Sequence, residues 1–183
     1  MRPRITGRRT PLLAGLVAAV AVIVAFLATG LGRDPSLIAS PLLGRAAPNF
    51  TLPQLDGPPM TLSKLKGQVV VINFWASWCA ECKVEQAALD QIWQQVRDSG
   101  VVVIGIDFED NIGNARAYVR TAGLTYPVVE DTNSRTALAY GLRGVPETFV
   151  VNQSGRVVYR VIGPIAAPAL ASEINSVLLA SAR

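Results

Sequence analysis

Continuous apolar runs alternate with regularly spaced apolar positions along the middle of the chain. Residues 69–75 and 101–106 are dominated by β-branched and aromatic side chains, a pattern typical of strands buried on both faces of a sheet. Between them, residues 79–99 carry apolar side chains at helical spacing, and Gly100 follows as a stop signal. The apolar positions of this expected helix are Val84, Ala88, Ile92, Trp93 and Val96. The pattern therefore predicts a buried strand, a helix and a second buried strand.

Shorter elements of both kinds surround this centre. The further strands that we expect are residues 50–52, 60–62, 127–129, 148–151 and 157–161, and the further helices are residues 111–121, 134–140 and 168–179. The last two strands flank the turn sequence at residues 152–155 and should form a hairpin. The β-α-β-α-β-β-α order predicts an α/β fold, with a central mixed sheet flanked by helices on both sides.

An uncharged, largely aliphatic run occupies residues 12–32. A helix of this length spans roughly 30 Å at about 1.5 Å per residue, which matches the hydrocarbon core of a bilayer. Four arginines precede the run and Arg33 follows it, which predicts a cytoplasmic N-terminus and an extracytoplasmic main domain. We favour an uncleaved anchor over a cleaved signal peptide because the run is long, although residues 28–30 offer a weak cleavage site. A buried soluble helix is least favoured, since neither flank supplies partners for an all-round apolar helix.

The chain thus divides into four expected segments. These are a basic cytoplasmic N-terminus (1–11), a transmembrane anchor or uncleaved signal (12–32), a linker (33–43) and one folded domain (44–183). The linker contains two prolines and no clear period, as a spacer between bilayer and domain would.

Composition and charge exclude several classes of function and of metal site. Half of the 183 residues are hydrophobic and 16% are charged, so the chain can bury a core. The net charge of +4 comes from the five arginines in residues 1–33, and the remainder has one excess negative charge, which argues against a nucleic-acid-binding face. The absence of His excludes imidazole-dependent hydrolysis and His-ligated metals or haem, and two Cys cannot form a four-thiolate zinc site within one chain.

The two cysteines, Cys79 and Cys82, lie where the strand at 69–75 passes into the helix at 79–99. The unpaired N–H groups of a helix N-terminus favour a thiolate, and the C-x-x-C spacing lets both sulfurs meet across one turn. Cys79 would face outward and attack a substrate disulfide, and Cys82, one turn further in, would resolve the mixed disulfide. A structural disulfide or a metal ion shared between two chains are the alternatives. Covalent haem attachment is excluded because Lys83, not His, follows Cys82.

Several separated segments resemble the thioredoxin superfamily, and most closely its membrane-anchored, extracytoplasmic TlpA/ResA/CcmG (DsbE) type. The matching segments are residues 47–52, 62–67, 73–82 and 144–149. They fall in family order, and the similarity spans about residues 44–179. The resemblance implies a thioredoxin-like fold, preceded by one N-terminal transmembrane helix, with a cis-proline at Pro146 beside the cysteine pair.

The same resemblance implies a substrate-binding role for residues around the cysteines. The residues that would hold an extended client segment are Trp78, Val145, Pro146 and Glu147. Without the resemblance, Pro146 is equally well explained as an ordinary turn proline. Glu147 is typical of the cytochrome c maturation branch of the family, and it could equally be a solvated loop acid.

Polar residues near the cysteines refine the expectation. Glu85 matches a family Glu that would assist proton transfer, and the alternative is a solvated helix residue. Asn73 stands where cytoplasmic thioredoxins carry a buried Asp, so we expect a buried, hydrogen-bonded amide. Ala80 and Glu81 depart from the family, which often has Pro between the cysteines. The charges of Glu81 and Glu85 would raise the pKa of the thiols and make the pair more reducing, with Lys83 opposing them.

The leading hypothesis is a membrane-tethered thiol–disulfide oxidoreductase that needs no cofactor or metal beyond the Cys79–Cys82 pair. The resemblance implies that its clients are protein disulfides, such as the Cys-x-x-Cys-His segment of apocytochrome c, and that a membrane thiol reductase supplies electrons. The catalytic domain would lie on the periplasmic side of the cell membrane. The alternatives are a general extracytoplasmic thiol reductase or oxidase with other clients, and a non-catalytic binding domain. A peroxidase is disfavoured, because peroxidatic sites do not use a Trp-Cys-x-x-Cys arrangement.

Overall fold

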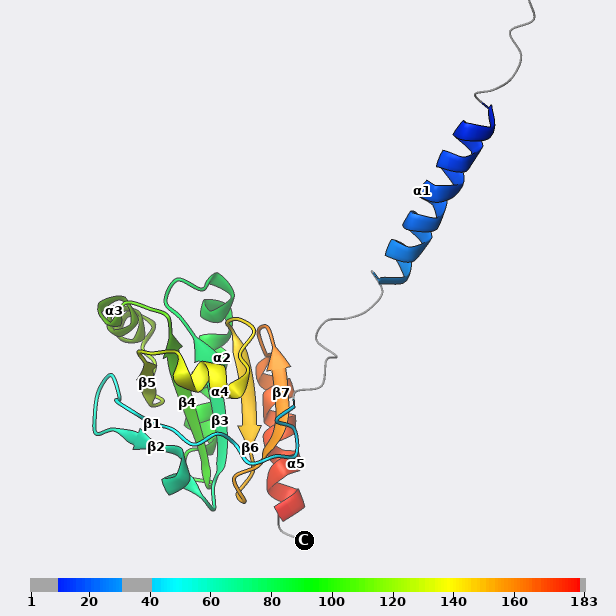
Figure 1. Cartoon of the computed structure of the whole chain (residues 1–183). Coiled ribbons are helices and arrows are strands. Elements are labelled where there is room, and N and C mark those ends of the chain that lie inside the picture. The colour runs from blue at the N-terminus through cyan, green and yellow to red at the C-terminus, as the bar shows by residue number, and fades with distance from the viewer. Residues whose placement is uncertain (1–9, 31–40, 182–183) are drawn as a thin grey trace, which may run out of the picture. The chain divides into compact units, whose positions relative to one another are not determined.

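The computed structural model describes residues 10–30 and 41–181. The chain forms two separate units, divided after Ile38. In the first unit the described part is the helix α1 (Thr10–Gly30), which overlaps most of the expected anchor (Figure 1). Among the described residues, no helix combines the length and the apolar character needed to cross a membrane. The expected basic N-terminus up to residue 9 and most of the expected linker lie outside the described residues.

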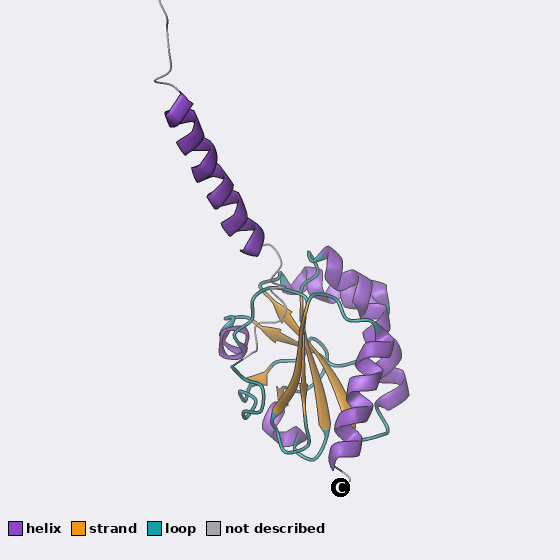
Figure 2. Ribbon diagram, turned by 90° about the vertical axis from the view of Figure 1, so that its right-hand side faces the viewer, coloured by secondary structure: helices purple, strands orange, loops and turns teal. Residues whose placement is uncertain are grey.

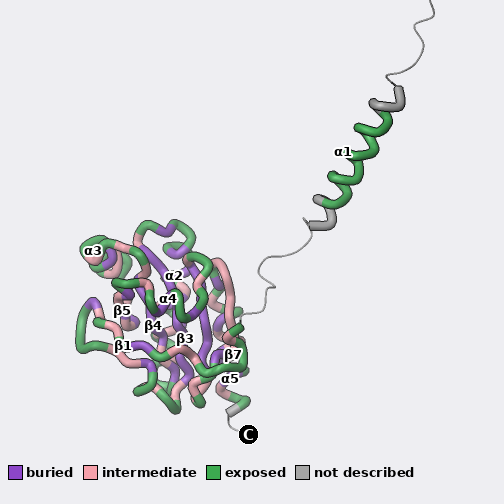
Figure 3. Tube along the Cα trace, viewed as in Figure 1, coloured by how far each residue is buried: buried purple, intermediate pink, exposed green. Residues whose placement is uncertain are grey.

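A five-stranded mixed sheet forms the centre of the second unit. Its strands, in spatial order, are β5 (Val128–Asp131), β4 (Val101–Phe108), β3 (Val69–Trp75), β6 (Glu147–Val151) and β7 (Val157–Ile162). β3, β4 and β5 run parallel to one another, whereas β6 is antiparallel to both β3 and β7. β3 is buried at every position, as its continuous β-branched sequence predicts (Figure 3). The expected mixed sheet and C-terminal hairpin are confirmed.

The N-terminal part of this unit adds a short antiparallel pair, β1 (Thr51–Leu52) and β2 (Met60–Thr61). A 3-10 helix, η2 (Leu62–Leu65), follows directly. The expected strand at 60–62 therefore ends one residue early, because the buried side chain of Leu62 opens the 3-10 turn instead.

Four helices cover the two faces of the sheet (Figure 2). They are α2 (Ala80–Val96), α3 (Ile112–Ala122), α4 (Arg135–Tyr140) and α5 (Ala167–Ser181). Core residues of α2, α3 and α5 pack with alternate side chains of β3 and β4 in one cluster. On the opposite face, α4 and the N-terminal segment pack over a second cluster that includes Phe74, Tyr140 and Phe149. A polar residue of the sheet therefore packs either against α2, α3 and α5 or against α4 and the N-terminal segment, depending on the face to which it points.

The buried face of α2 differs from the one that its apolar residues predicted. Val84 is 76% exposed, whereas the neighbouring Glu85 and Gln86 are 2% and 1% exposed. The helix buries the stripe formed by Cys82, Glu85, Gln86, Leu89 and Ile92. The stripe still has helical spacing, but it includes two polar side chains and excludes Val84.

Candidate active site

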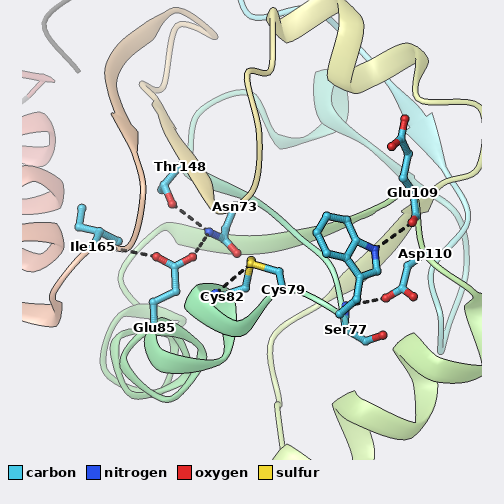
Figure 4. Close-up of a disulfide and its surroundings, with 10 residues drawn as sticks. Asn73, Ser77, Cys79, Cys82, Glu85, Glu109, Asp110, Thr148 and Ile165 are labelled. Atoms are coloured by element: carbon cyan, nitrogen blue, oxygen red, sulfur yellow. Dashed lines mark hydrogen bonds between the residues drawn. A yellow bond between two sulfur atoms is a disulfide. The ribbon is translucent and has the colours of Figure 1, made fainter. Parts of the chain in front are cut away.

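Cys79 and Cys82 form a disulfide at the junction of β3 and α2, with 2.06 Å between the sulfurs and 5.3 Å between the Cα atoms (Figure 4). Cys79 is the N-cap residue of α2, and its Sγ accepts a hydrogen bond from the backbone N–H of Cys82 at 3.0 Å. Cys79 is 6% exposed and Cys82 is fully buried. The end of the helix with unpaired N–H groups therefore faces the more accessible sulfur, where it stabilises a thiolate after reduction.

A buried polar group lies on the same face of the sheet, one helical turn beyond Cys82. The side-chain N–H₂ of Asn73 donates to Glu85 Oε1 at 2.7 Å and to Thr148 Oγ1 at 2.9 Å. Glu85 Oε2 accepts from the backbone N–H of Ile165 at 2.9 Å. Asn73 is thus buried and hydrogen-bonded, as expected, and Figure 4 shows it between Glu85, Thr148 and the cysteines.

Burial raises the pKa of Glu85 from 4.5 to about 7, against the lowering effect of the N–H groups of Ile165 and Asn73. A carboxyl group that titrates near neutral pH can accept or donate a proton during exchange. The alternative of a solvated helix residue is wrong, because the side chain is almost completely buried. Its role in proton transfer stays a prediction.

The peptide bond between Val145 and Pro146 is cis, which confirms the geometry that the resemblance implied. Pro146 directly precedes β6, and its carbonyl oxygen accepts from the N–H of Gly163 at 2.9 Å. Thr148, two residues further along β6, contacts Asn73, so the cis-proline segment and the buried polar group belong to neighbouring strands. The substrate-binding roles of Val145 and Pro146 stay predictions.

Glu147 is not a solvated loop acid, because it is the first residue of β6. It is fully buried and pairs with Arg160, whose Nε lies 2.6 Å from Glu147 Oε1. Its other oxygen accepts from the backbone N–H of Arg143 at 3.1 Å. In the sheet register Glu147 is opposite Phe74, whose side chain packs on the α4 face. The structure therefore separates Glu147 from Glu85, which lies on the other face.

Trp78 is the most accessible residue of the expected site, at 59% exposure. Its indole N–H donates to the backbone oxygen of Glu109 at 3.0 Å, and the N–H of the preceding Ser77 donates to Asp110 Oδ2 at 2.5 Å (Figure 4). These two acids follow β4 and did not emerge from sequence reasoning. Acids at the carboxyl end of the strand next to β3 are the signal that could have suggested them.

A third acid, Asp107, lies behind this loop and is 2% exposed. Burial raises its pKa from 3.8 to about 8, and the charge of Asp110, a hydrogen bond with its side chain and the charge of Glu130 act in the same direction. Within the described residues, no group of three or more His, Cys, Asp or Glu side chains could hold a metal ion.

Comparison with known proteins agrees with this geometry. The AhpC/TSA family model matches residues 43–160. The chain is 39% identical over 159 residues to the thiol:disulfide interchange protein DsbE of Allochromatium vinosum, covering 85% of this chain and 86% of that protein. It is 33% identical over 153 residues to the thiol:disulfide interchange protein HelX of Rhodobacter capsulatus, covering 82% and 85%. The crystal structure of a thioredoxin-family thiol:disulfide interchange protein from Chlorobium tepidum superposes with a TM-score of 0.68 at 28% identity, covering 73% of this chain and 95% of that one.

Proposed function

The chain belongs to the AhpC/TSA family, and within it to the TlpA/ResA/CcmG group of thioredoxin-like thiol–disulfide oxidoreductases; from this premise we propose that it reduces disulfides of extracytoplasmic client proteins, with apocytochrome c as the principal client. The observation that carries the proposal is the Cys79–Cys82 pair at the N-terminus of α2. The names of the relatives in Allochromatium vinosum and Rhodobacter capsulatus support thiol–disulfide interchange as the reaction.

The reaction begins with both cysteines reduced. The Cys79 thiolate attacks one sulfur of the client disulfide, which forms a mixed disulfide and releases the other client sulfur as a thiolate that takes up a proton. Cys82 then loses its proton and attacks Cys79, which forms the Cys79–Cys82 disulfide and releases the second client thiol. Two electrons pass to the client, and a membrane thiol reductase restores the dithiol. Glu85 is the buried group that exchanges protons in these steps.

Residues 12–32 anchor the protein in the membrane, with the domain on the periplasmic side. The uncharged run and the arginines that flank it support this part of the proposal. Fractionation of cells that express the chain should recover it with membranes, and N-terminal sequencing of that material should find the uncleaved start. Recovery of a shortened, soluble form would mean that the segment is a signal peptide.

The reduction potential separates a reductant from an oxidant of exported proteins. We expect the Cys79–Cys82 couple to equilibrate with a defined thiol–disulfide buffer at or below roughly −220 mV. A potential near roughly −120 mV would place the protein with strong oxidants and refute the reductant proposal. Failure to equilibrate would indicate a structural disulfide.

The client is tested by the rate at which the reduced chain reduces a disulfide-bonded Cys-x-x-Cys-His peptide. A matched peptide in which the residues around the cysteines are shuffled serves as control. Faster reduction of the first peptide supports apocytochrome c as client, and equal rates favour a general reductase.

A further inference from the structure

The loop between β4 and α3 holds the backbone that leads into Cys79. Asp110 accepts the N–H of Ser77, and the backbone oxygen of Glu109 accepts the indole N–H of Trp78 (Figure 4). Both bonds reach the two residues that immediately precede the nucleophile. The position of Cys79 at the helix N-terminus therefore depends on a loop more than thirty residues further along the chain.

This loop has a defined conformation of its own. Glu109 adopts a φ of 48°, which is uncommon for a residue with a side chain. Asn111 caps α3 by accepting from the N–H groups of Gly113 and Asn114. The second oxygen of Asp110 accepts the N–H of Asn111 at 2.7 Å. The Asp110 carboxylate thus joins the start of α3 to the loop before Cys79.

Asp107 is a buried acid next to the Asp110 carboxylate. It lies opposite Trp75 and Glu130 in the register of the sheet, and its Oδ1 has no hydrogen-bond partner among the described residues. A small cavity of about 50 Å³ is lined by Asp107, Glu109, Asp110, Glu130, Asp131 and Thr132. Five of these six residues are acids, so a proton on Asp107 removes one charge from a crowded negative site.

We propose that Asp110 is a positioning residue for thiol–disulfide exchange, and that Asp107 in its protonated form holds the Asp110 carboxylate in place by a hydrogen bond. The exchange activity of the cysteine pair is the only premise, so the proposal does not depend on which client is reduced. Loss of the Asp107 proton removes the donor and adds a charge of the same sign as Asp110. The Ser77 and Trp78 segment is then held less firmly, and Cys79 is displaced from the geometry in which it attacks.

The charged groups that line the cavity with Asp107 are all carboxylates. Glu130 is the register neighbour of Asp107 on β5, and Glu109 and Asp110 belong to the loop that follows β4. Asp131, also on β5, lines the same cavity and accepts the N–H of Ala137. Burial disfavours ionisation of Asp107 most, and the charges of Asp110 and Glu130 act in the same direction. The proton on Asp107 is therefore retained at neutral pH and lost near pH 8.

The test compares pH profiles for reduction of glutathione disulfide, used as a probe, by the full reduced chain. In the Asp107→Asn variant the amide donates to Asp110 at every pH. We expect the ratio of its rate constant to that of the natural chain to be constant up to about pH 7 and to rise several-fold by about pH 9.5, as the natural chain loses its positioning hydrogen bond. A ratio that stays constant with pH would overturn the proposal.

Asp110 is tested by the Asp110→Ala variant. We expect a rate constant about tenfold lower, because misplaced reacting groups lose rate steeply. In the Asp107→Asn/Asp110→Ala double variant, the alkaline gain of the Asp107→Asn substitution should vanish, since its hydrogen-bond partner is gone. Asp98→Asn, which changes a 93% exposed acid, is the matched control and should leave the profile unchanged. Full activity of Asp110→Ala would also overturn the proposal.

A measurement on the natural chain keeps the proposal testable if the variants do not fold. Trp78 is the most exposed of the three tryptophans, so acrylamide quenching of fluorescence reports mainly on it. We expect quenching to increase between about pH 7 and about pH 9.5 as the loop releases the indole. Quenching that does not change over this range would contradict the proposed hydrogen bond.

Discussion

Replacing Glu85 with Gln should change how the stability of the oxidised protein depends on pH. The pKa of Glu85 rises from 4.5 to about 7 on folding, mainly because the side chain is buried. The folded state then binds more protons than the unfolded state between these two pH values, so this contribution to stability is present below about pH 4.5 and is lost as pH rises through about 7. At 1.36 kcal/mol per pKa unit, the loss amounts to about 3 kcal/mol.

The Glu85→Gln side chain does not ionise, so its curve lacks this loss. Gln can still accept from Asn73, but its NH₂ group cannot accept the N–H of Ile165, which costs about 1 kcal/mol at every pH. The free energy of unfolding of the variant, measured by urea titration between about pH 4 and about pH 8, should therefore gain about 3 kcal/mol relative to the natural chain over that range.

Glu81→Gln is the matched control, because Glu81 lies in the first turn of the same helix but is exposed. Its unfolding free energy should differ from that of the natural chain by less than about 1 kcal/mol, the size of the interaction between a first-turn acid and the helix N-terminus. If the difference between Glu85→Gln and the natural chain were the same at acidic and alkaline pH, Glu85 would not titrate as a buried group, and its assignment to proton transfer would lose its physical basis.

The remaining predictions concern the exchange reaction and the two faces of the sheet. Cys82→Ser should accumulate a mixed disulfide with the client on a non-reducing gel, whereas Cys79→Ser should form none, because only Cys79 is placed to attack. Arg160→Met should lower the free energy of unfolding by about 3–5 kcal/mol in urea titration, since it leaves the Glu147 carboxylate buried without its partner; a loss below about 1 kcal/mol would argue against the buried ion pair. Gly105→Ala should cost about 1–3 kcal/mol by the same measurement, because the added Cβ would lie 2.9 Å from an indole nitrogen and 3.0 Å from a tyrosine ring carbon, and an unchanged midpoint would contradict this packing.

Local patterns in the chain were sufficient to predict the elements and the reactive pair. The strand at 69–75 was predicted with its observed bounds, and the other elements of the domain agree to within a few residues, apart from the 3-10 turn at Leu62. Cys79 and Cys82 lie at the expected strand-to-helix junction. These features follow from neighbouring residues, because β-branched runs, helical spacing and a helix N-terminus are properties of short segments.

The surroundings of the acids required the tertiary structure. Glu85 is buried because its partners Asn73 and Ile165 come from β3 and from the segment before α5, 12 and 80 residues away in the chain. Glu147 is buried because Arg160 lies on the adjacent strand β7, on the face opposite to Glu85. None of these three partners can be identified from spacing along the sequence. Apolar spacing alone therefore assigned Val84 to the apolar positions of the helix, although it is exposed, and it left a solvated helix residue open as the alternative for the buried Glu85.

The sequence by itself thus determined which atoms react, since two cysteines at the start of a helix that follows a buried strand are specified within about a dozen residues. Only the fold decided which carboxyl groups lie near those atoms, which of them are buried and at what pH they carry a proton. The physical reason is that the pKa of a carboxyl group depends on its desolvation and on charges and donors within a few ångströms, and segments distant in the chain supply these.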